Sequence, residues 1–252
     1  MSVTYYMSDC IGFVQRLDTF GNDLTIVNAA RVSFNKESSE ISGADAKLIK
    51  FLVKHNHISP FFHPQIRFRF KMPIFVAREW FRHTVGLSRN EVSRRYVDTL
   101  PDCWIPRTSD IRERDPKLKQ GSKESAVVNA DSMYEKIVNS TRQSILVYAE
   151  LLHSGVAPEI ARGILPQTMY TEFIETGSLY AYARICSLRL DPGAQVEIRR
   201  YAKLVDAALA TVFPIAWDAL RAKFNKGSSV EYNTPSVKPS EHPVIGYGGI
   251  GC

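Results

Sequence analysis

The sequence predicts an α+β fold: a single domain with a small mixed or antiparallel sheet and several long helices. Two observations predict this class. Strand and helix patterns are mixed early in the chain, and helical patterns dominate later, an order typical of α+β proteins. The chain has 252 residues, 44% of them hydrophobic, so it can bury a sizeable core without disulfides or metals.

The composition limits the class of partner before any motif is considered. The formal net charge of +6 favours an anionic partner: nucleic acid, a nucleotide or another phosphorylated metabolite. No run of about 18 apolar residues occurs, so we expect no membrane-spanning segment. The N-terminus shows no secretory pattern, and the four cysteines are widely spaced, so we expect reduced thiols and a cytoplasmic protein.

Strand and helix signals are mixed in the N-terminal part. A strand, a Gly-Asn-Asp turn at residues 21–23 and a short apolar segment are expected over residues 10–34. Ser42 is a candidate N-cap for a helix over roughly residues 43–56. Residues 65–72 alternate between apolar and basic side chains, which predicts a half-buried strand.

Helical periodicity dominates after a polar excursion from Asp98 to about residue 124. We expect helices over about residues 128–155, from Pro158 to Pro166, over residues 170–189, and from Gln195 to about Asn225 with a kink or split at Pro214. The folded domain is expected to span residues 1–226. Residues 227–252 are rich in Ser, Pro and Gly and are expected to form an extended tail.

The chemically densest stretch is residues 73–96, PIFVAREWFRHTVGLSRNEVSRRY. Its apolar opening predicts a buried helix turn, with Arg78 and Arg82 on one face because they are four residues apart. Four arginines from Arg82 to Arg95 are accompanied by one acid, which favours an anion. Guanidinium groups bind phosphate bidentately and serine hydroxyls add donors, so we predict a phosphate site at the rim of the core.

Other chemical signatures are weak or absent. His55, His57 and His63 match no zinc spacing, so ring stacking or hydrogen bonding at a pocket edge is favoured and no metal is expected. Neither Ser88 nor Ser93 lies in a Gly-x-Ser-x-Gly elbow. No glycine-rich phosphate loop of the dinucleotide-binding or P-loop type occurs, which disfavours both of those binding modes.

Two distant arginines, Arg162 and Arg189, occur among apolar helical residues. An arginine in such surroundings is commonly ion-paired within the fold, and Asp191 and Glu197 are candidate partners for Arg189. Alternatively, both arginines join the basic stretch around a phosphorylated ligand. The pattern alone supports the two interpretations equally.

Five ordered blocks resemble the flavin-dependent thymidylate synthase family. The longest is Phe68-x-Phe70-x-x-Pro73-Ile-Phe-Val-Ala-Arg-Glu-Trp-Phe-Arg82-His83, continuing to Asn90-Glu91-Val-Ser93-Arg-Arg95-Tyr96. The others are Gly21-Asn-Asp with Ala30-Arg-Val-Ser33-Phe, His57-x-Ser59-Pro60-Phe61, Ala161-Arg162-x-x-Leu165-Pro166, and Leu188-Arg189 with Ala194-Gln195-x-Glu197. Together they span roughly residues 11–225, which makes the resemblance specific.

The resemblance implies an enzyme that converts dUMP to dTMP with methylenetetrahydrofolate and NADPH through bound FAD. It also implies a homotetramer with shared active sites, and neither nucleic acid nor membrane as a partner. By position, the expected dUMP contacts are Glu79, Arg82, Glu91, Val92, Ser93, Arg94, Arg95, Arg189 and, from another subunit, Arg162. The expected flavin contacts are His57, Ser59, Arg82, His83, Thr84, Asn90, Glu91, Ser178, Tyr180 and Arg184, with Ser33 as a further candidate.

Arg189 is the catalytic residue that the resemblance implies. A guanidinium beside N3 of uracil stabilises an enolate-like ring and makes C5 nucleophilic without an enzyme thiolate. Several neighbouring positions depart from the family pattern. Thr84 stands where arginine is usual, one extra residue precedes Ser88, and Arg89 offers the missing charge from a different backbone position.

Further departures concern the ligand contacts themselves. Glu79 replaces a glutamine, Phe62 a glutamate, and both Ser178 and Arg184 replace asparagines. A carboxylate beside dUMP needs a proton or a cation. Two alternatives therefore stay open: a family member with altered activity that binds nucleotide, and a basic nucleic-acid-binding protein with salt-dependent affinity for polynucleotides and no flavin.

Overall fold

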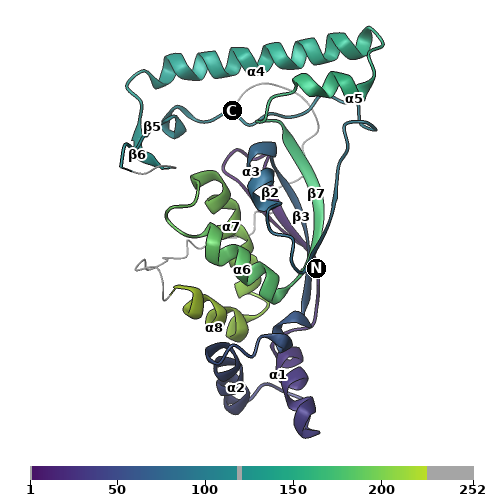
Figure 1. The fold of residues 1–252 in the computed structure, drawn as a ribbon, viewed down its shortest axis with the longest axis vertical. Coiled ribbons are helices and arrows are strands. Elements are labelled where there is room, and N and C mark those ends of the chain that lie inside the picture. Colours follow the sequence, from purple (N-terminus) through teal and green to yellow (C-terminus); the bar gives the residue numbers. More distant parts are fainter. Residues whose placement is uncertain (1, 118–120, 226–252) are drawn as a thin grey trace.

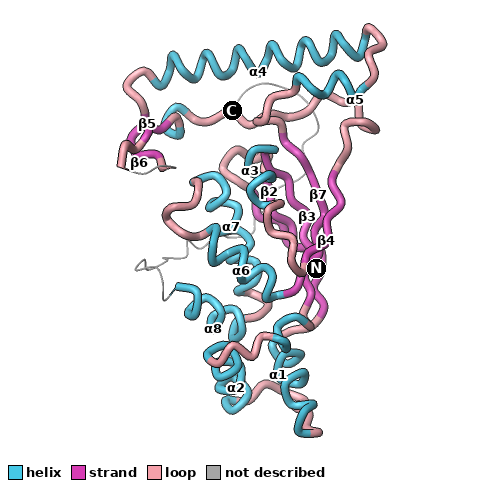
Figure 2. The backbone as a smooth tube through the Cα atoms, in the orientation of Figure 1, coloured by secondary structure: helices cyan, strands magenta, loops and turns pink. Residues whose placement is uncertain are grey.

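The computed structural model describes residues 2–117 and 121–225, which form an antiparallel sheet with helices packed on one face (Figures 1 and 2). The strand order is β1-β2-β3-β7-β4, and each neighbouring pair is antiparallel. The strands are β1 (Val3–Tyr6), β2 (Phe13–Phe20), β3 (Gln65–Pro73), β4 (Leu87–Glu91) and β7 (Tyr170–Ser178). The prediction of a single α+β domain with an antiparallel sheet is confirmed.

Strand β3 is the half-buried strand that the alternating pattern predicts. Its four apolar side chains from Ile66 to Met72 are fully buried. On the opposite face, Arg67 and Arg69 are exposed and form ion pairs with acids of the neighbouring strands β2 and β7. The basic face of β3 is therefore neutralised within the sheet.

Two capped helices, α1 (Asp23–Arg31) and α2 (Gly43–Lys54), lie together at one end of the molecule (Figure 1). The short apolar segment expected after the Gly-Asn-Asp turn is thus a helix. Asn22 starts it, because its side chain accepts hydrogen bonds from backbone N–H groups of the first turn and completes a capping box. Ser42 caps α2 as predicted.

The helix expected over residues 170–189 is wrong in its first half, which is β7; helix α6 (Leu179–Arg189) follows. β7 is rich in aromatic and β-branched residues and pairs with β3 on one side and β4 on the other. Gly177 lies opposite Leu87 in this pairing, and a Cβ there would come within 2.3 Å of Leu87 Cδ2, so the leucine side chain would have to move. Short apolar runs do not distinguish strand from helix by periodicity, so long-range pairing decides.

Helices α6 and α7 (Val196–Ala210) contact the sheet, and α8 (Pro214–Asn225) packs against α2, α6 and α7 (Figure 1). The predicted split at Pro214 is confirmed. The start of α8 is fixed by the buried Asp23, whose carboxylate accepts hydrogen bonds from the backbone N–H groups of Ile215 and Ala216, both at 3.0 Å. The first and last described helices are thereby joined.

The polar excursion contains elements that the sequence did not predict: η3 (Thr108–Asp110) and the antiparallel pair of β5 (Arg112–Arg114) and β6 (Ser122–Ala126). Helix α4 (Ala130–His153) confirms the long predicted helix and crosses the end of the molecule opposite α1 and α2 (Figure 1). Of its side chains only Tyr148 is buried. Its other apolar side chains are partly covered within the described chain, and Leu146 is exposed.

Short helical segments complete the described chain: α3 (Ile74–Trp80), α5 (Pro158–Ala161), η1 (Val32–Phe34), η2 (Ser59–Phe62) and η4 (Arg162–Ile164). No helix in residues 2–117 and 121–225 has the length and apolar character needed to cross a membrane. The predicted tail, residues 227–252, lies outside the described residues.

Candidate active site

Helix α3 and the residues directly after it carry four of the expected ligand-binding residues: Glu79, Arg82, His83 and Thr84. Val76, Ala77 and Trp80 face the core, which leaves Glu79 partly exposed at the helix end. Arg82 lies beyond the end of the helix, so the prediction that it stacks on Arg78 on one helix face is wrong. Arg82 is exposed in the turn.

The catalytic candidate Arg189, the last residue of α6, contacts this turn. Its Nε donates to Nε2 of His83 at 3.0 Å, and its Nη2 donates to the backbone oxygen of Glu79 at 2.8 Å. Its Nη1 lies 3.6 Å from the Glu79 carboxylate. The candidate partners Asp191 and Glu197 are therefore wrong, and the structure brings together three residues that the sequence places in the same site.

His83 is uncharged in this environment. Burial, followed by the positive charges of Arg189, Arg89 and Arg184, lowers the pKa of His83 from its usual 6.5 to about 4. A neutral imidazole has one acceptor nitrogen. Because Nε2 accepts from Arg189, the proton must be on Nδ1.

The Glu79 carboxyl is influenced by groups from several elements. Burial raises its pKa above the ordinary value, Arg189 and Arg82 act in the opposite direction, and Glu197 of α7 raises the pKa further. The Glu79 carboxylate thus lies among the expected dUMP contacts with the cation of Arg189 next to it. A carboxylate near dUMP needs such a cation or a proton.

Arg89 does not offer the missing charge of Thr84 to a ligand. Its Nε pairs with the buried carboxylate of Glu175, and its Nη2 donates to the backbone oxygen of His83. Its guanidinium also lies over the Phe81 ring, 5.1 Å from the centroid. Arg89 therefore joins β4 and β7 to the turn that carries His83, a structural role.

The expected phosphate-binding segment follows β4, a strand that the sequence did not predict. The backbone N–H of Val92 donates to the backbone oxygen of Glu172 of β7 at 2.9 Å, which fixes the start of the segment. Arg94 donates to the backbone oxygen of Thr99. The exposed guanidinium of Arg95 lies over the Tyr96 ring. Among the described residues Arg95 has no carboxylate partner, so its charge is available to an anion.

The other expected contacts in and around β4 have different surroundings. Glu91 accepts a hydrogen bond from the hydroxyl of Thr171 at 2.5 Å. The Ser93 hydroxyl accepts the backbone N–H of Arg95 at 3.3 Å. Thr84 and Asn90 are exposed.

Expected flavin contacts from two distant parts of the sequence lie on neighbouring elements: Ser59 on η2, and Tyr180 and Arg184 on α6. The ring of Phe62 in η2 lies 5.3 Å from that of Tyr180 in α6. Ser59 and Arg184 are exposed on these two elements. Ser178 is buried, and its hydroxyl accepts the backbone N–H of Ala181 at 3.2 Å, so it caps α6 in this structure.

Within the described residues, the remaining candidates form no hydrogen bond or ion pair with Arg189. His57 is exposed and packs against Phe51, with ring centroids 6.1 Å apart, which is the ring contact favoured over a metal. Ser33 is exposed in η1. Arg162 is exposed in η4, directly after α5, and Figure 1 places α5 beside α4 and away from α6. No possible metal cluster of three or more His, Cys, Asp or Glu residues occurs within the described part of the chain.

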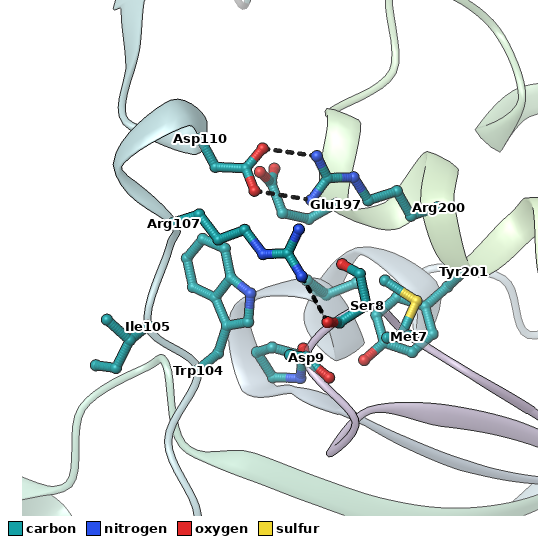
Figure 3. Close-up of a pocket in the computed structure, with 12 residues that line it drawn as sticks. Met7, Ser8, Asp9, Trp104, Ile105, Arg107, Asp110, Glu197, Arg200 and Tyr201 are labelled. Carbon is teal, nitrogen blue, oxygen red and sulfur yellow. Dashed lines mark hydrogen bonds and ion pairs between the residues drawn. The ribbon is translucent and has the colours of Figure 1, made fainter. Parts of the chain in front are cut away.

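A cavity of about 30 Å³ lies beside the site and was not expected from the sequence (Figure 3). Asp110 of η3 faces Arg200 of α7 across it, with a 2.6 Å contact. Arg112 also pairs with Asp110 and with Glu197 at 2.6 Å. The charge run at Arg112 was the available signal for this network, which attaches the excursion to α7.

Proteins similar to this chain are known in sequence and in structure. The sequence model of the family "Thymidylate synthase complementing protein" matches residues 17–215. A flavin-dependent thymidylate synthase of Thermus thermophilus is 36% identical over 248 residues, 94% of this chain and 89% of that protein. One from Thermotoga neapolitana is 40% identical over 202 residues, 80% and 85% of the two chains.

A solved structure is also similar. The UMP/dUMP methylase PolB from Streptomyces cacaoi, bound with 5-Br dUMP, superposes with a TM-score of 0.75 at 30% identity. The match covers 83% of this chain and 94% of that chain. Sequence and fold thus agree over most of the length, and the chain belongs to the flavin-dependent thymidylate synthase family.

Proposed function

We propose that the protein is a thymidylate synthase that methylates C5 of dUMP to give dTMP, with methylenetetrahydrofolate as the one-carbon donor, NADPH as the reductant and bound FAD. The observation that carries this proposal is the position of the Arg189 guanidinium, in a chain that belongs to this family. Two of its nitrogens donate hydrogen bonds, to His83 and to the backbone oxygen of Glu79. The similar PolB structures contain 5-Br dUMP and 5-Br UMP, which supports a uridine monophosphate as the substrate class.

Substrate binding is assigned to the segment after β4. Arg95 is exposed and unpaired with any described acid, and Ser93 is next to it, so both can contact the phosphate. Glu91, Val92, Arg94 and Arg82 complete the wall of the nucleotide site. This assignment explains why a run with four arginines remains only partly neutralised within the chain.

Arg189 is assigned to the uracil ring. A positive charge fixed beside N3 and its neighbouring oxygen stabilises the enolate-like form, which increases electron density at C5. His83 is neutral and accepts from Arg189 Nε, so it orients the guanidinium without adding a charge. No cysteine nucleophile is required by this mechanism.

The residues between η2 and the turn after α3 fit a flavin. Arg82 and Arg184 are exposed and form no ion pair within residues 2–117 and 121–225, so positive charge is available to a pyrophosphate. Aromatic side chains of η2 and α6 offer a surface for a planar ring. FAD would supply the hydride chemistry that the side chains cannot supply. Its contacts are assigned to His57, Ser59, Arg82, His83, Thr84, Asn90, Glu91, Ser178, Tyr180 and Arg184.

We further assign a cytoplasmic homotetramer with shared active sites. Within the described chain helix α4 fully buries only Tyr148, so the exposed Leu146 and the partly covered apolar side chains beside it are available to another subunit. Arg162 is exposed next to α5 and away from α6, as expected for a residue that completes the site of a neighbour.

The direct test is product formation. Purified protein is incubated with dUMP, methylenetetrahydrofolate and NADPH, with and without FAD, and dTMP is measured by chromatography. We expect dTMP that depends on all four components. A parallel reaction with UMP distinguishes the two nucleotides bound by PolB, and absence of any methylated product from folded, nucleotide-binding protein would contradict the proposal.

A further inference from the structure

Two of the three guanidinium nitrogens of Arg189 are hydrogen-bonded, and the third is not. Nε and Nη2 each donate a hydrogen bond, to His83 and to the backbone of Glu79. Nη1 has no hydrogen-bond partner among the described residues, and the Glu79 carboxylate at 3.6 Å is its only ion-pair partner there. Two nitrogens therefore hold the side chain in place, while the third faces a carboxylate that it does not hydrogen-bond.

The Glu79 carboxylate is held by charge alone. Within the described residues no donor hydrogen-bonds to it, in contrast to the buried carboxylates of Asp23 and Glu175, which accept hydrogen bonds from N–H groups. A carboxylate without such bonds can move away from its cation at little cost, since a partly exposed ion pair contributes roughly 1 kcal/mol or less.

We propose that Glu79 competes with the nucleotide for Arg189: in the free protein its carboxylate faces the nitrogen that the uracil ring requires, and it gives way when the nucleotide binds. This inference rests on the proposed function, in which Arg189 faces uracil. The carboxylate and an enolate-like uracil are both anionic oxygen ligands for Nη1. Their mutual repulsion makes simultaneous binding unfavourable.

Protonation of Glu79 should therefore control nucleotide affinity. The charged groups that face its carboxyl are Arg189 from α6, Arg82 from the turn after α3 and Glu197 from α7, while the adjacent His83 is neutral. As the pH rises through the raised pKa of Glu79, the carboxylate ionises and competes with the nucleotide. Because the protonated form binds nucleotide more tightly, binding should take up protons.

The test is calorimetric titration of dUMP into the full-length, FAD-loaded protein from about pH 5 to 8, in buffers of different ionisation enthalpy. Wild type should lose affinity as pH rises and take up protons on binding. Glu79→Gln should bind dUMP roughly two- to fivefold more tightly at the upper end, the value of a partly exposed ion pair, without that proton uptake. The dUMP phosphate titrates in all proteins, so the difference between variants is decisive.

Two further variants make the outcome unambiguous. Glu79→Asp keeps a carboxylate and should retain the proton uptake, and Asp18→Asn makes the same acid-to-amide change at an exposed pair in β2 and should match wild type. Weaker binding by Glu79→Gln would identify Glu79 as a direct ligand, and unchanged binding would identify a static ion pair. Both results overturn the inference. Failure of wild type itself to bind dUMP would overturn the proposed function.

Discussion

Two arginine–glutamate pairs on either side of His83 have different environments. The side chains of Arg89 and Glu175 are 15% and 0% exposed, and the carboxylate also accepts an indole N–H at 3.1 Å. The side chains of Arg189 and Glu79 are 19% and 29% exposed, and their charged atoms lie 3.6 Å apart. The first pair is closed by hydrogen bonds, whereas the second is open at its carboxylate.

This difference distinguishes a pair that stabilises the fold, Arg89 with Glu175, from a pair of the same residue types in the candidate active site, Arg189 with Glu79. A buried pair must satisfy its polar atoms within the fold, because an uncompensated buried charge is very unfavourable. An open pair can exchange one partner for a ligand. His83 connects the two pairs, since its backbone oxygen accepts from Arg89 and its imidazole accepts from Arg189.

The largest expected effect is that of Arg89→Ala on stability. Removal of this guanidinium leaves the Glu175 carboxylate buried without its cation, which typically costs about 3–5 kcal/mol. Urea unfolding should show this loss in the free energy of unfolding. The turn that carries His83 should loosen at the same time, because Arg89 also donates to its backbone.

A double variant tests whether the loss comes from the unpaired charge. Arg89→Met combined with Glu175→Leu removes both charges and should be more stable than Arg89→Ala. A loss below about 1 kcal/mol in Arg89→Ala would place this pair in the class of exposed ion pairs. The distinction between the two arginines would then disappear.

In contrast to Arg89→Ala, Arg189→Ala should lower the rate of reaction strongly and stability only slightly. We expect the rate of dTMP formation to fall roughly 10²–10³-fold, the usual cost of removing one transition-state donor. The free energy of unfolding should fall by only about 1–2 kcal/mol, because the open ion pair contributes little and the loss is mainly that of two partly buried hydrogen bonds. Arg189→Lys should not restore the rate, since one ammonium cannot replace two fixed guanidinium nitrogens and also supply the third to the uracil ring.

His83, which joins the pairs, should make stability depend on pH. Its pKa is about 4 in the fold and near 6.5 when unfolded, so its contribution is fully present above pH 6.5 and is lost as the pH falls toward 4. Unfolding of His83→Gln across this window should show a shallower loss than wild type. His153→Gln, an exposed histidine at the end of α4, is the matched control and should retain the wild-type slope.

Local signals in the sequence were sufficient for several elements. The alternation of β3, the Ser42 cap and the split at Pro214 depend on neighbours in sequence, and each is confirmed. Strands β4 and β7 were not predicted, because their identity depends on pairing between distant segments. Gly177, which lies opposite Leu87 in that pairing, has no local pattern that marks it.

The candidate site was predictable as a set of residues but not as a set of contacts. The ordered blocks identify Glu79, His83 and Arg189 together, and the structure joins them. The sequence did not reveal that Arg89 is committed to Glu175, since the two are distant in the chain and charge counting treats every arginine alike. Burial, rather than charge, distinguishes the two arginines.

The smallest expected effect is at a third type of pair, Asp18 with Arg67, whose side chains are 56% and 50% exposed on the open face of the sheet. Asp18→Asn should lower the free energy of unfolding by roughly 1 kcal/mol or less, because water solvates both groups before and after the change. The effect should decrease further in high salt, which screens exposed charges. A loss as large as that of Arg89→Ala, measured by urea unfolding, would show that ion-pair distance rather than burial determines stability in this sheet.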